Sequence, residues 1–104
     1  MLEDGTLVQY GELPGMWRAG YIVGHYTHQI MGEVYCVRTP HNAIAGQQFD
    51  PVPVEKVRPA TREDLQRSLE HDRREALLRC DEFIDEAIAV IGISPNDPAL
   101  QNAN

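Results

Sequence analysis

Long hydrophobic runs are missing from this sequence of 104 residues. No stretch approaches the roughly 18–20 consecutive apolar residues that a membrane-spanning helix needs. The opening segment MLEDGTLVQY has neither the basic start nor the apolar centre of a signal peptide. We therefore expect a cytoplasmic protein with no membrane partner. Hydrophobic residues still make up 42% of the chain, which is enough for the packed core of one small domain.

Positive charge is also scarce. Nine lysines and arginines face sixteen aspartates and glutamates, which gives a formal net charge of −7. Most of the excess lies in residues 61–92, where nine acidic residues accompany five arginines. A phosphate backbone would be repelled by this field, so we expect no nucleic-acid partner. We interpret these charges as a solvated helix face, in preference to a docking surface or a nucleic-acid mimic.

The sequence contains only two cysteines, Cys36 and Cys80, which fall in different predicted elements. Because there is no secretory signal and only one possible pair, we expect buried free thiols, in preference to a disulfide or a metal role. Glycine-rich phosphate loops, CxxC pairs and a serine–histidine–aspartate pattern are absent, so no catalytic residue and no cofactor are predicted.

The four histidines suggest no metal site. His25 and His28 are three residues apart at the end of a predicted strand, so their side chains would point to opposite faces. A metal site would need further ligands that the sequence does not supply. We interpret His25, His28, His41 and His71 as surface or hydrogen-bonded side chains.

Residues 5–57 show a period-two alternation that is broken by glycine and proline, which is typical of short antiparallel strands. The pattern predicts strands over 5–10, 17–26, 33–39 and 47–52, with one more short strand after a turn at 53–57. Loops are predicted at 11–16, 29–32 and 40–46. This spacing favours a mainly β fold, a five-stranded SH3-like barrel over residues 1–60.

Two glycines inside the long second strand, Gly20 and Gly24, suit the corners that a small barrel needs. In the third strand Val34 and Cys36 share one face, and Tyr35 lies on the other. We expect Trp17, Ile22, Val34 and Cys36 to be largely buried, with Tyr26 or Tyr35 partly so.

A helix is predicted over residues 61–92 as part of the same domain. Thr61 and Asp64 resemble a capping box, and Gly92 followed by Pro95 supplies the stop. About thirty residues at ~1.5 Å each give ~45 Å, which exceeds the width of the barrel. The helix therefore either breaks near residues 71–74 or projects and pairs with another chain, and we favour pairing. Residues 93–104 are expected to form a disordered tail.

An apolar stripe follows the second half of this helix at helical spacings. Because large apolar patches mark interfaces, we predict a homo-oligomer, most readily a dimer, built through this stripe. The predicted interface residues are Leu77, Cys80, Phe83, Ile84, Ile88 and Ile91.

Aromatic residues gather in the predicted barrel. Several rings beside Asp50 could form a cage for a cation, although a barrel core with one or two rings at its rim is the favoured interpretation. The six rings are those of Tyr10, Trp17, Tyr21, Tyr26, Tyr35 and Phe49.

Three stretches resemble the type II, plasmid-borne dihydrofolate reductases. They read WRAGYIVGHY, GEVYCVRT and QQFDPVPVEKV, and GTLV precedes them. The match covers about residues 4–58, while the helix from Thr61 has no counterpart in that family. The resemblance implies an SH3-like barrel, four copies of which form a ring around one pore that substrate and NADPH share.

Residue by residue, the resemblance matches Gln48 to the family's pore glutamine and Phe49 to the adjacent isoleucine. Asp50 falls where the family has a tyrosine, and Tyr10 falls at about the position of its pore lysine. Both departures act against an anionic cofactor. We therefore expect little or no reductase activity.

Three functions stay open. The favoured one is a non-catalytic binding module, which oligomerises through its helix and holds a protein or small-molecule ligand on its barrel. The alternatives are a diverged type II dihydrofolate reductase that uses NADPH, and an acidic inhibitor of a protein with a basic groove. A small mobile-element cassette protein would suit any of them. The candidate ligand-binding residues are Gln48, Phe49, Asp50, Tyr10 and Trp17.

Overall fold

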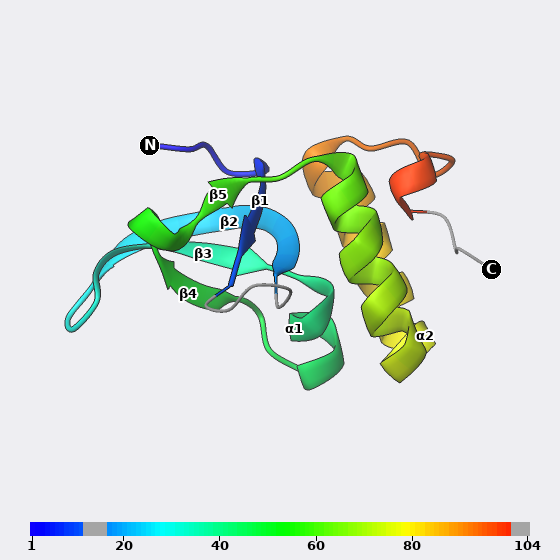
Figure 1. The fold of residues 1–104 in the computed structure, drawn as a ribbon, viewed down its shortest axis with the longest axis horizontal. Coiled ribbons are helices and arrows are strands. Elements are labelled where there is room, and N and C mark those ends of the chain that lie inside the picture. The colour runs from blue at the N-terminus through cyan, green and yellow to red at the C-terminus, as the bar shows by residue number, and fades with distance from the viewer. Residues whose placement is uncertain (12–16, 101–104) are drawn as a thin grey trace.

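The computed structural model describes residues 1–11 and 17–100, with the side chains of residues 73–80 and 99 outside the description. Figure 1 shows a β-sheet on one side of the molecule and helices on the other. No helix in the described part of the chain combines the length and the apolar character needed to cross a membrane. The elements in chain order are β1 (Leu7–Tyr10), β2 (Arg18–His28), β3 (Gly32–Arg38), α1 (Pro40–Ala45), β4 (Asp50–Pro53), the 3₁₀ turn η1 (Val54–Lys56), β5 (Arg58–Pro59), α2 (Arg62–Ile91) and the 3₁₀ turn η2 (Pro98–Leu100).

The five predicted strands are all present and form one antiparallel sheet in the order β4-β3-β2-β1-β5. The register between β2 and β3 shifts between Ile22 and Gly24. Gly24, one of the two glycines predicted at corners, therefore lies beside an irregularity of the sheet. Pairings within the described residues leave β4 and β5 as the two edges. The structure therefore shows an open, five-stranded antiparallel sheet.

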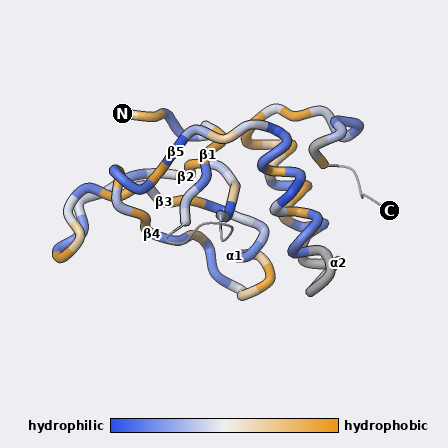
Figure 2. The backbone as a smooth tube through the Cα atoms, viewed as in Figure 1, coloured by the Kyte–Doolittle hydropathy of each residue, from blue (hydrophilic) through white to orange (hydrophobic). Residues whose placement is uncertain are grey.

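The hairpin between β2 and β3 projects from the body of the molecule (Figure 1). Its turn is stabilised by His28, whose Nδ1 accepts hydrogen bonds from the backbone N–H groups of Ile30 and Met31 at 3.1 and 3.2 Å. Gly32 closes the turn with a φ of +77°, which a side chain would strain. Figure 2 shows an apolar tip, where Ile30 is 90% exposed.

The segment predicted as a loop at 40–46 is the short helix α1, so that prediction is wrong. Thr39 caps the helix by accepting from the backbone N–H of Asn42, whose side chain accepts in turn from the backbone of Thr39. Pro40 occupies the first turn, and Gly46 ends the helix in the left-handed conformation. These are ordinary start and stop signals, but they enclose only six residues.

Helix α2 does not extend as one straight rod. Leu65 and Leu69 in its first half share a buried cluster with Phe83 and Ala87 in its second half. A straight helix would separate Leu65 from Ala87 by about 33 Å, so the chain reverses direction between Leu69 and Phe83. Figure 1 shows the two halves beside each other, green in front and orange behind. The projecting helix that we favoured is therefore wrong, and the apolar stripe finds partners within its own chain.

Two buried clusters lie on opposite faces of the sheet. Neighbouring residues of β2 divide between them, because Tyr21 packs with the helices whereas Ile22 packs with Val8, Val37 and Val52. Each face of the sheet therefore carries a buried cluster, and Tyr35 and Val37 of β3 belong to the cluster of Ile22.

The core prediction is confirmed for Ile22, Val34 and Cys36, all of which are buried. Cys36 is a free thiol, and burial raises the pKa of this thiol. Tyr35 is buried rather than partly buried, while Tyr26 is exposed on the hairpin. The Cys80 side chain lies outside the described residues.

The end of the chain packs against the helices as far as Leu100, so residues 93–100 do not form the disordered tail that we expected. Ile93 and Leu100 belong to the buried cluster of α2. Asp97 is buried and forms an ion pair with Arg62 at the start of α2. Residues 101–104 lie outside the described part.

Arg38 ties the sheet to the second half of α2. Its Nε lies 2.9 Å from the Glu86 carboxylate, and its Nη1 donates to the carbonyl oxygens of Gln47 and Gln48. Burial, followed by the nearby Glu86 carboxylate, raises the pKa of Tyr21 to about 12, although Arg38 acts in the opposite direction. Arg38 thus holds Gln47 and Gln48, which precede β4, against both the sheet and α2.

The predicted cap of α2 is confirmed and leads to a testable acid dependence. The backbone N–H of Thr61 donates to the Asp64 carboxylate at 2.8 Å, and this bond holds the pKa of Asp64 below its usual value of 3.8. A lowered folded pKa stabilises the fold above the unfolded pKa, and this contribution is lost as the pH falls through the folded pKa. Asp64→Ala should cost about 1 kcal/mol at neutral pH. In urea unfolding, the difference in the free energy of unfolding between this variant and the wild type should shrink below a pH of about 4.

Glu63→Ala is the matched control, because Glu63 lies in the same first turn without serving as the cap. It should cost a few tenths of a kcal/mol, the ordinary value for an acidic residue near a helix N-terminus. Equal losses for the two variants at neutral pH would contradict the importance of the cap.

Candidate functional site

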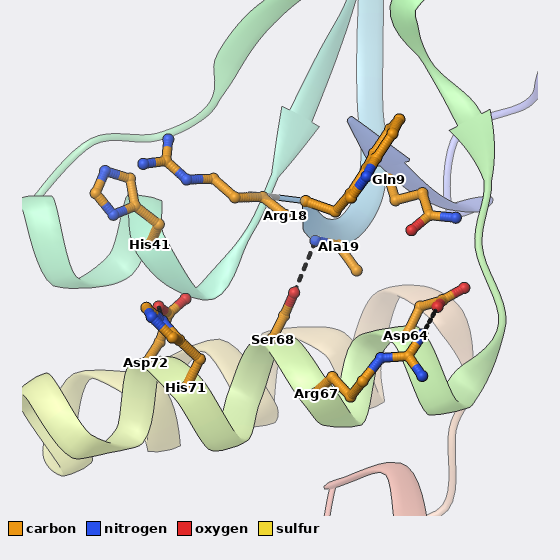
Figure 3. A pocket seen from close by; sticks show the side chains of 10 residues that line it. Gln9, Arg18, Ala19, His41, Asp64, Arg67, Ser68, His71 and Asp72 are labelled. Carbon is orange, nitrogen blue, oxygen red and sulfur yellow. Dashed lines mark hydrogen bonds and ion pairs between the residues drawn. The ribbon is translucent and has the colours of Figure 1, made fainter. Parts of the chain in front are cut away.

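A pocket of about 510 Å³ lies between the sheet and the first half of α2. Its volume falls in the range of roughly 300–1,000 Å³ that is usual for small-molecule sites. Figure 3 shows side chains from β1, β2, α1 and α2 around it. The α2 wall consists of residues at spacings that share one helix face, namely Asp64, Arg67, Ser68, His71 and Asp72. The opposite wall is formed by Gln9, Trp17, Arg18, Ala19 and His41.

A buried hydrogen bond fixes the two walls relative to each other. The backbone N–H of Ala19 donates to Ser68 Oγ at 2.9 Å (Figure 3). Ala19 also pairs with Gln9 across β1 and β2. The start of β2 and the face of α2 are therefore held at one separation, which preforms the pocket.

Trp17 lines this pocket, so the expectation that it is largely buried in the core is wrong. Its side chain is 36% exposed. The guanidinium carbon of Arg58 lies 4.7 Å from the centre of the indole ring, which is a cation–π contact. The ring is thus held in place while still reaching the pocket.

Tyr10 and Asp50, two predicted ligand-binding residues, contact each other directly. The Tyr10 hydroxyl donates to Asp50 Oδ2 at 2.5 Å. Burial, and then the hydrogen bond to this carboxylate, raise the pKa of Tyr10 well above its usual value of 10, against a smaller opposite effect of Arg18. Arg18 Nη1 lies 3.9 Å from the same carboxylate oxygen and also lines the pocket. Arg18 therefore connects the Tyr10–Asp50 pair to the pocket.

The Tyr10 contact predicts an alkaline dependence of stability. A raised folded pKa gives stability that is complete below the unfolded pKa near 10 and is lost as the pH rises through the folded pKa. Tyr10→Phe should cost about 1 kcal/mol at pH ~8, because Asp50 loses a donor. In denaturant unfolding this deficit should shrink above a pH of about 11.

Tyr26→Phe is the control for Tyr10→Phe, because the Tyr26 ring is exposed on the hairpin. It should change the free energy of unfolding by less than about 0.5 kcal/mol. A Tyr10→Phe deficit that is the same at neutral and alkaline pH would show that the hydroxyl does not act through its proton.

The other two predicted ligand-binding residues do not line the pocket. Gln48 and Phe49 precede β4 and have exposed side chains, and the carbonyl oxygen of Gln48 accepts from Arg38 at 3.0 Å. The structure thus divides the predicted site in two. Trp17 lies at the pocket, and Tyr10 with Asp50 form a pair that Arg18 links to it.

The predicted oligomer stripe is mostly accounted for within the chain. Phe83 is completely buried, and its ring lies 5.7 Å from that of Tyr21. Ile84, Ile88 and Ile91 are partly buried against the same cluster. The side chains of Leu77 and Cys80 lie outside the described residues. Assembly into an oligomer stays a prediction.

Two polar side chains of the pocket, Ser68 and Asp64, are engaged within the fold. Ser68 Oγ accepts from Ala19, and within the described residues no hydrogen bond joins it to His41 or His71. The Asp64 carboxylate is engaged by the cap of α2. In the part of the chain that the structure describes, no three histidine, cysteine, aspartate or glutamate side chains are grouped to hold a metal ion.

Sequence reasoning missed most of the pocket residues. Arg18, His41 and Ser68 come from three elements, and nothing in their spacing indicates that they meet. The one available signal was on α2, where Asp64, Ser68 and Asp72 follow one another at four-residue spacing and share one helix face. On this face the small polar Ser68 lies between two carboxylates.

Comparison with known proteins identifies no relative. None of the protein-family models, curated proteins or solved structures compared with the chain matches it.

Proposed function

We propose that this chain is a non-catalytic binding module that holds a small ligand in the pocket between its sheet and α2. The observation that carries the proposal is the position of Trp17. A large aromatic ring costs free energy when it is left in water, yet this ring lines a preformed pocket and is held there by Arg58. An exposed aromatic ring that is fixed in this way is typical of a binding surface.

The scaffold of this proposal is an SH3-like barrel. The strand order β4-β3-β2-β1-β5 supports it, as does the short turn η1 between β4 and β5. In such a scaffold the sheet supplies rigid positions for Trp17 and Arg18, and α2 closes the open side of the pocket.

The indole N–H of Trp17 provides the test, because this is the only tryptophan in the chain and gives one side-chain signal in a ¹⁵N-resolved NMR spectrum. Small aromatic fragments of negative, neutral and positive charge are titrated into labelled protein. We expect at least one class to shift the indole signal together with the backbone signals of Ala19 and Ser68. Trp17→Ala should abolish the binding without unfolding the protein. Fragments that shift only signals away from the pocket would overturn the proposal.

The enzyme alternative, a diverged type II dihydrofolate reductase, would use Gln48, Phe49 and Asp50 in a pore between copies of the chain. The hydrogen bond between Tyr10 and Asp50 favours the binding module, because the two positions that depart from the family engage each other. We expect no oxidation of NADPH when the protein is incubated with NADPH and dihydrofolate. Turnover above the uncatalysed rate would favour the enzyme.

A further inference from the structure

Most charges around the pocket already have partners inside the protein. The Asp64 carboxylate accepts from Thr61 at 2.8 Å and pairs with the Arg67 guanidinium. Asp72 lies 3.0 Å from the Nδ1 atom of His71. Arg67 thus offsets the charge of Asp64 and is already engaged in an ion pair, while Asp72 is engaged by the ring of His71.

The opposite wall is different, because its donors are poorly matched with acceptors. Arg18 Nη1 lies 3.9 Å from Asp50, which is beyond hydrogen-bond distance, and that carboxylate oxygen already accepts from Tyr10 at 2.5 Å. Among the residues that the structure describes, no hydrogen bond or ion pair engages the side chain of His41 or the indole N–H of Trp17. Figure 3 shows Arg18 extending toward His41 across this wall. The wall therefore presents the guanidinium of Arg18, the imidazole of His41 and the indole N–H of Trp17 around one pocket.

The same wall carries a flat apolar surface. Trp17 lines the pocket, and the Arg58 guanidinium covers its ring at 4.7 Å. Within the described residues, Arg58 has this contact and no carboxylate partner. Arg58 thus places one positive charge against the indole, in a protein whose net charge is −7, and Arg18 brings a second arginine to the same wall.

We infer that the pocket binds a small planar carboxylate, with the carboxylate on Arg18 and His41 and the ring against Trp17. This inference rests on the proposed function and names the ligand class of that same site. The guanidinium fork of arginine matches the two oxygens of a carboxylate, and an indole favours offset contact with another aromatic ring. A volume of about 510 Å³ accommodates a ligand with one or two fused rings.

The experiment uses 2-naphthoate as the probe and 2-naphthalenemethanol as a neutral analogue with the same ring system. Each is titrated into the full-length labelled protein while the Trp17 indole signal is followed. We expect 2-naphthoate to bind at least about tenfold more tightly than the alcohol, which is the effect of one charge-assisted hydrogen bond.

Two variants that each remove one arginine charge localise the carboxylate. Arg18→Gln should weaken 2-naphthoate binding by about tenfold or more and leave the alcohol unaffected. Arg67→Gln removes a charge from the same pocket, but that charge is engaged by Asp64, so it should change the affinity by less than about threefold. His41→Ala should cause a smaller loss than Arg18→Gln, because a neutral imidazole offers one donor.

The outcomes separate this inference from the proposed function. Equal binding of 2-naphthoate and the alcohol at Trp17 would overturn the carboxylate assignment and leave the binding pocket intact. Equal losses for Arg18→Gln and Arg67→Gln would likewise overturn the assignment to Arg18. If no fragment of any charge moves the indole signal of the folded protein, both the inference and the proposed function fail.

Discussion

Replacing Phe83 with alanine should lower the free energy of unfolding by about 3–5 kcal/mol, the usual cost of truncating a buried phenylalanine. The side chain is completely buried, and its ring contacts Tyr21 of β2 at a centroid distance of 5.7 Å. It also shares a cluster with Leu65 and Leu69 of the first half of α2. One truncation therefore loosens the sheet and both halves of α2. Chemical denaturation followed by circular dichroism would measure the loss.

Val90→Ala is the control for Phe83→Ala, because Val90 lies on the same half of α2 and is half exposed. It should cost less than about 1 kcal/mol. The experiment also separates an internal core from an interface between copies. If Phe83 packs within its own chain, the melting temperature of Phe83→Ala is low at every protein concentration. If the variant stays folded but its mass in solution falls relative to the wild type, Phe83 would instead lie at a contact between subunits.

The sheet could be predicted because its signals are local. Glycine and proline separate short alternating segments, and each predicted strand overlaps an observed one. The cap of α2 could be predicted for the same reason, since Thr61 and Asp64 are only three residues apart. Both features depend on neighbours in sequence, so one chain without relatives is sufficient to find them.

The reversal of α2 could not be predicted with the same certainty. No glycine or proline interrupts residues 62–91, so intrinsic propensity favours one uninterrupted helix. Tertiary packing decides the outcome, because folding back lets Leu65, Leu69, Phe83 and Ala87 bury their side chains in one cluster. The apolar stripe was recognised correctly, but a stripe does not specify whether its partner is another chain or the same one.

The pocket lay beyond sequence reasoning because its walls meet through long-range contacts. The bond between Ala19 and Ser68, which joins the two walls, links residues 49 positions apart. The pair of Tyr10 and Asp50, which Arg18 connects to the pocket, links residues 40 positions apart. Trp17 was assigned to the core because tryptophan is usually well buried. In the structure it precedes β2 and lies outside both buried clusters. Its exposure is therefore a feature that only the fold reveals.

Gly20→Ala should cost about 3 kcal/mol or more, or prevent folding altogether. An added Cβ at position 20 would lie 1.9 Å from the carbonyl oxygen of Arg38 and 3.0 Å from the Cα atom of Thr39. These are backbone atoms, so no side-chain rotation can relieve the clash, and β2 would have to move away from β3. Thermal unfolding of the purified variant, or its recovery in soluble form, measures the effect.

Gly24→Ala is the matched control in the same strand. The nearest atom to its added Cβ would be Cys36 Sγ at 3.9 Å, which is an ordinary van der Waals contact. This variant should change the free energy of unfolding by less than about 1 kcal/mol. An increase in stability would also agree with the structure, because alanine restricts the unfolded chain. Gly20 directly follows Ala19, whose N–H holds Ser68 across the pocket. Any Gly20→Ala protein that does fold should therefore lose ligand contact at Trp17, whereas Gly24→Ala should retain it. Full stability of Gly20→Ala would mean that β2 and β3 lie further apart than the structure shows.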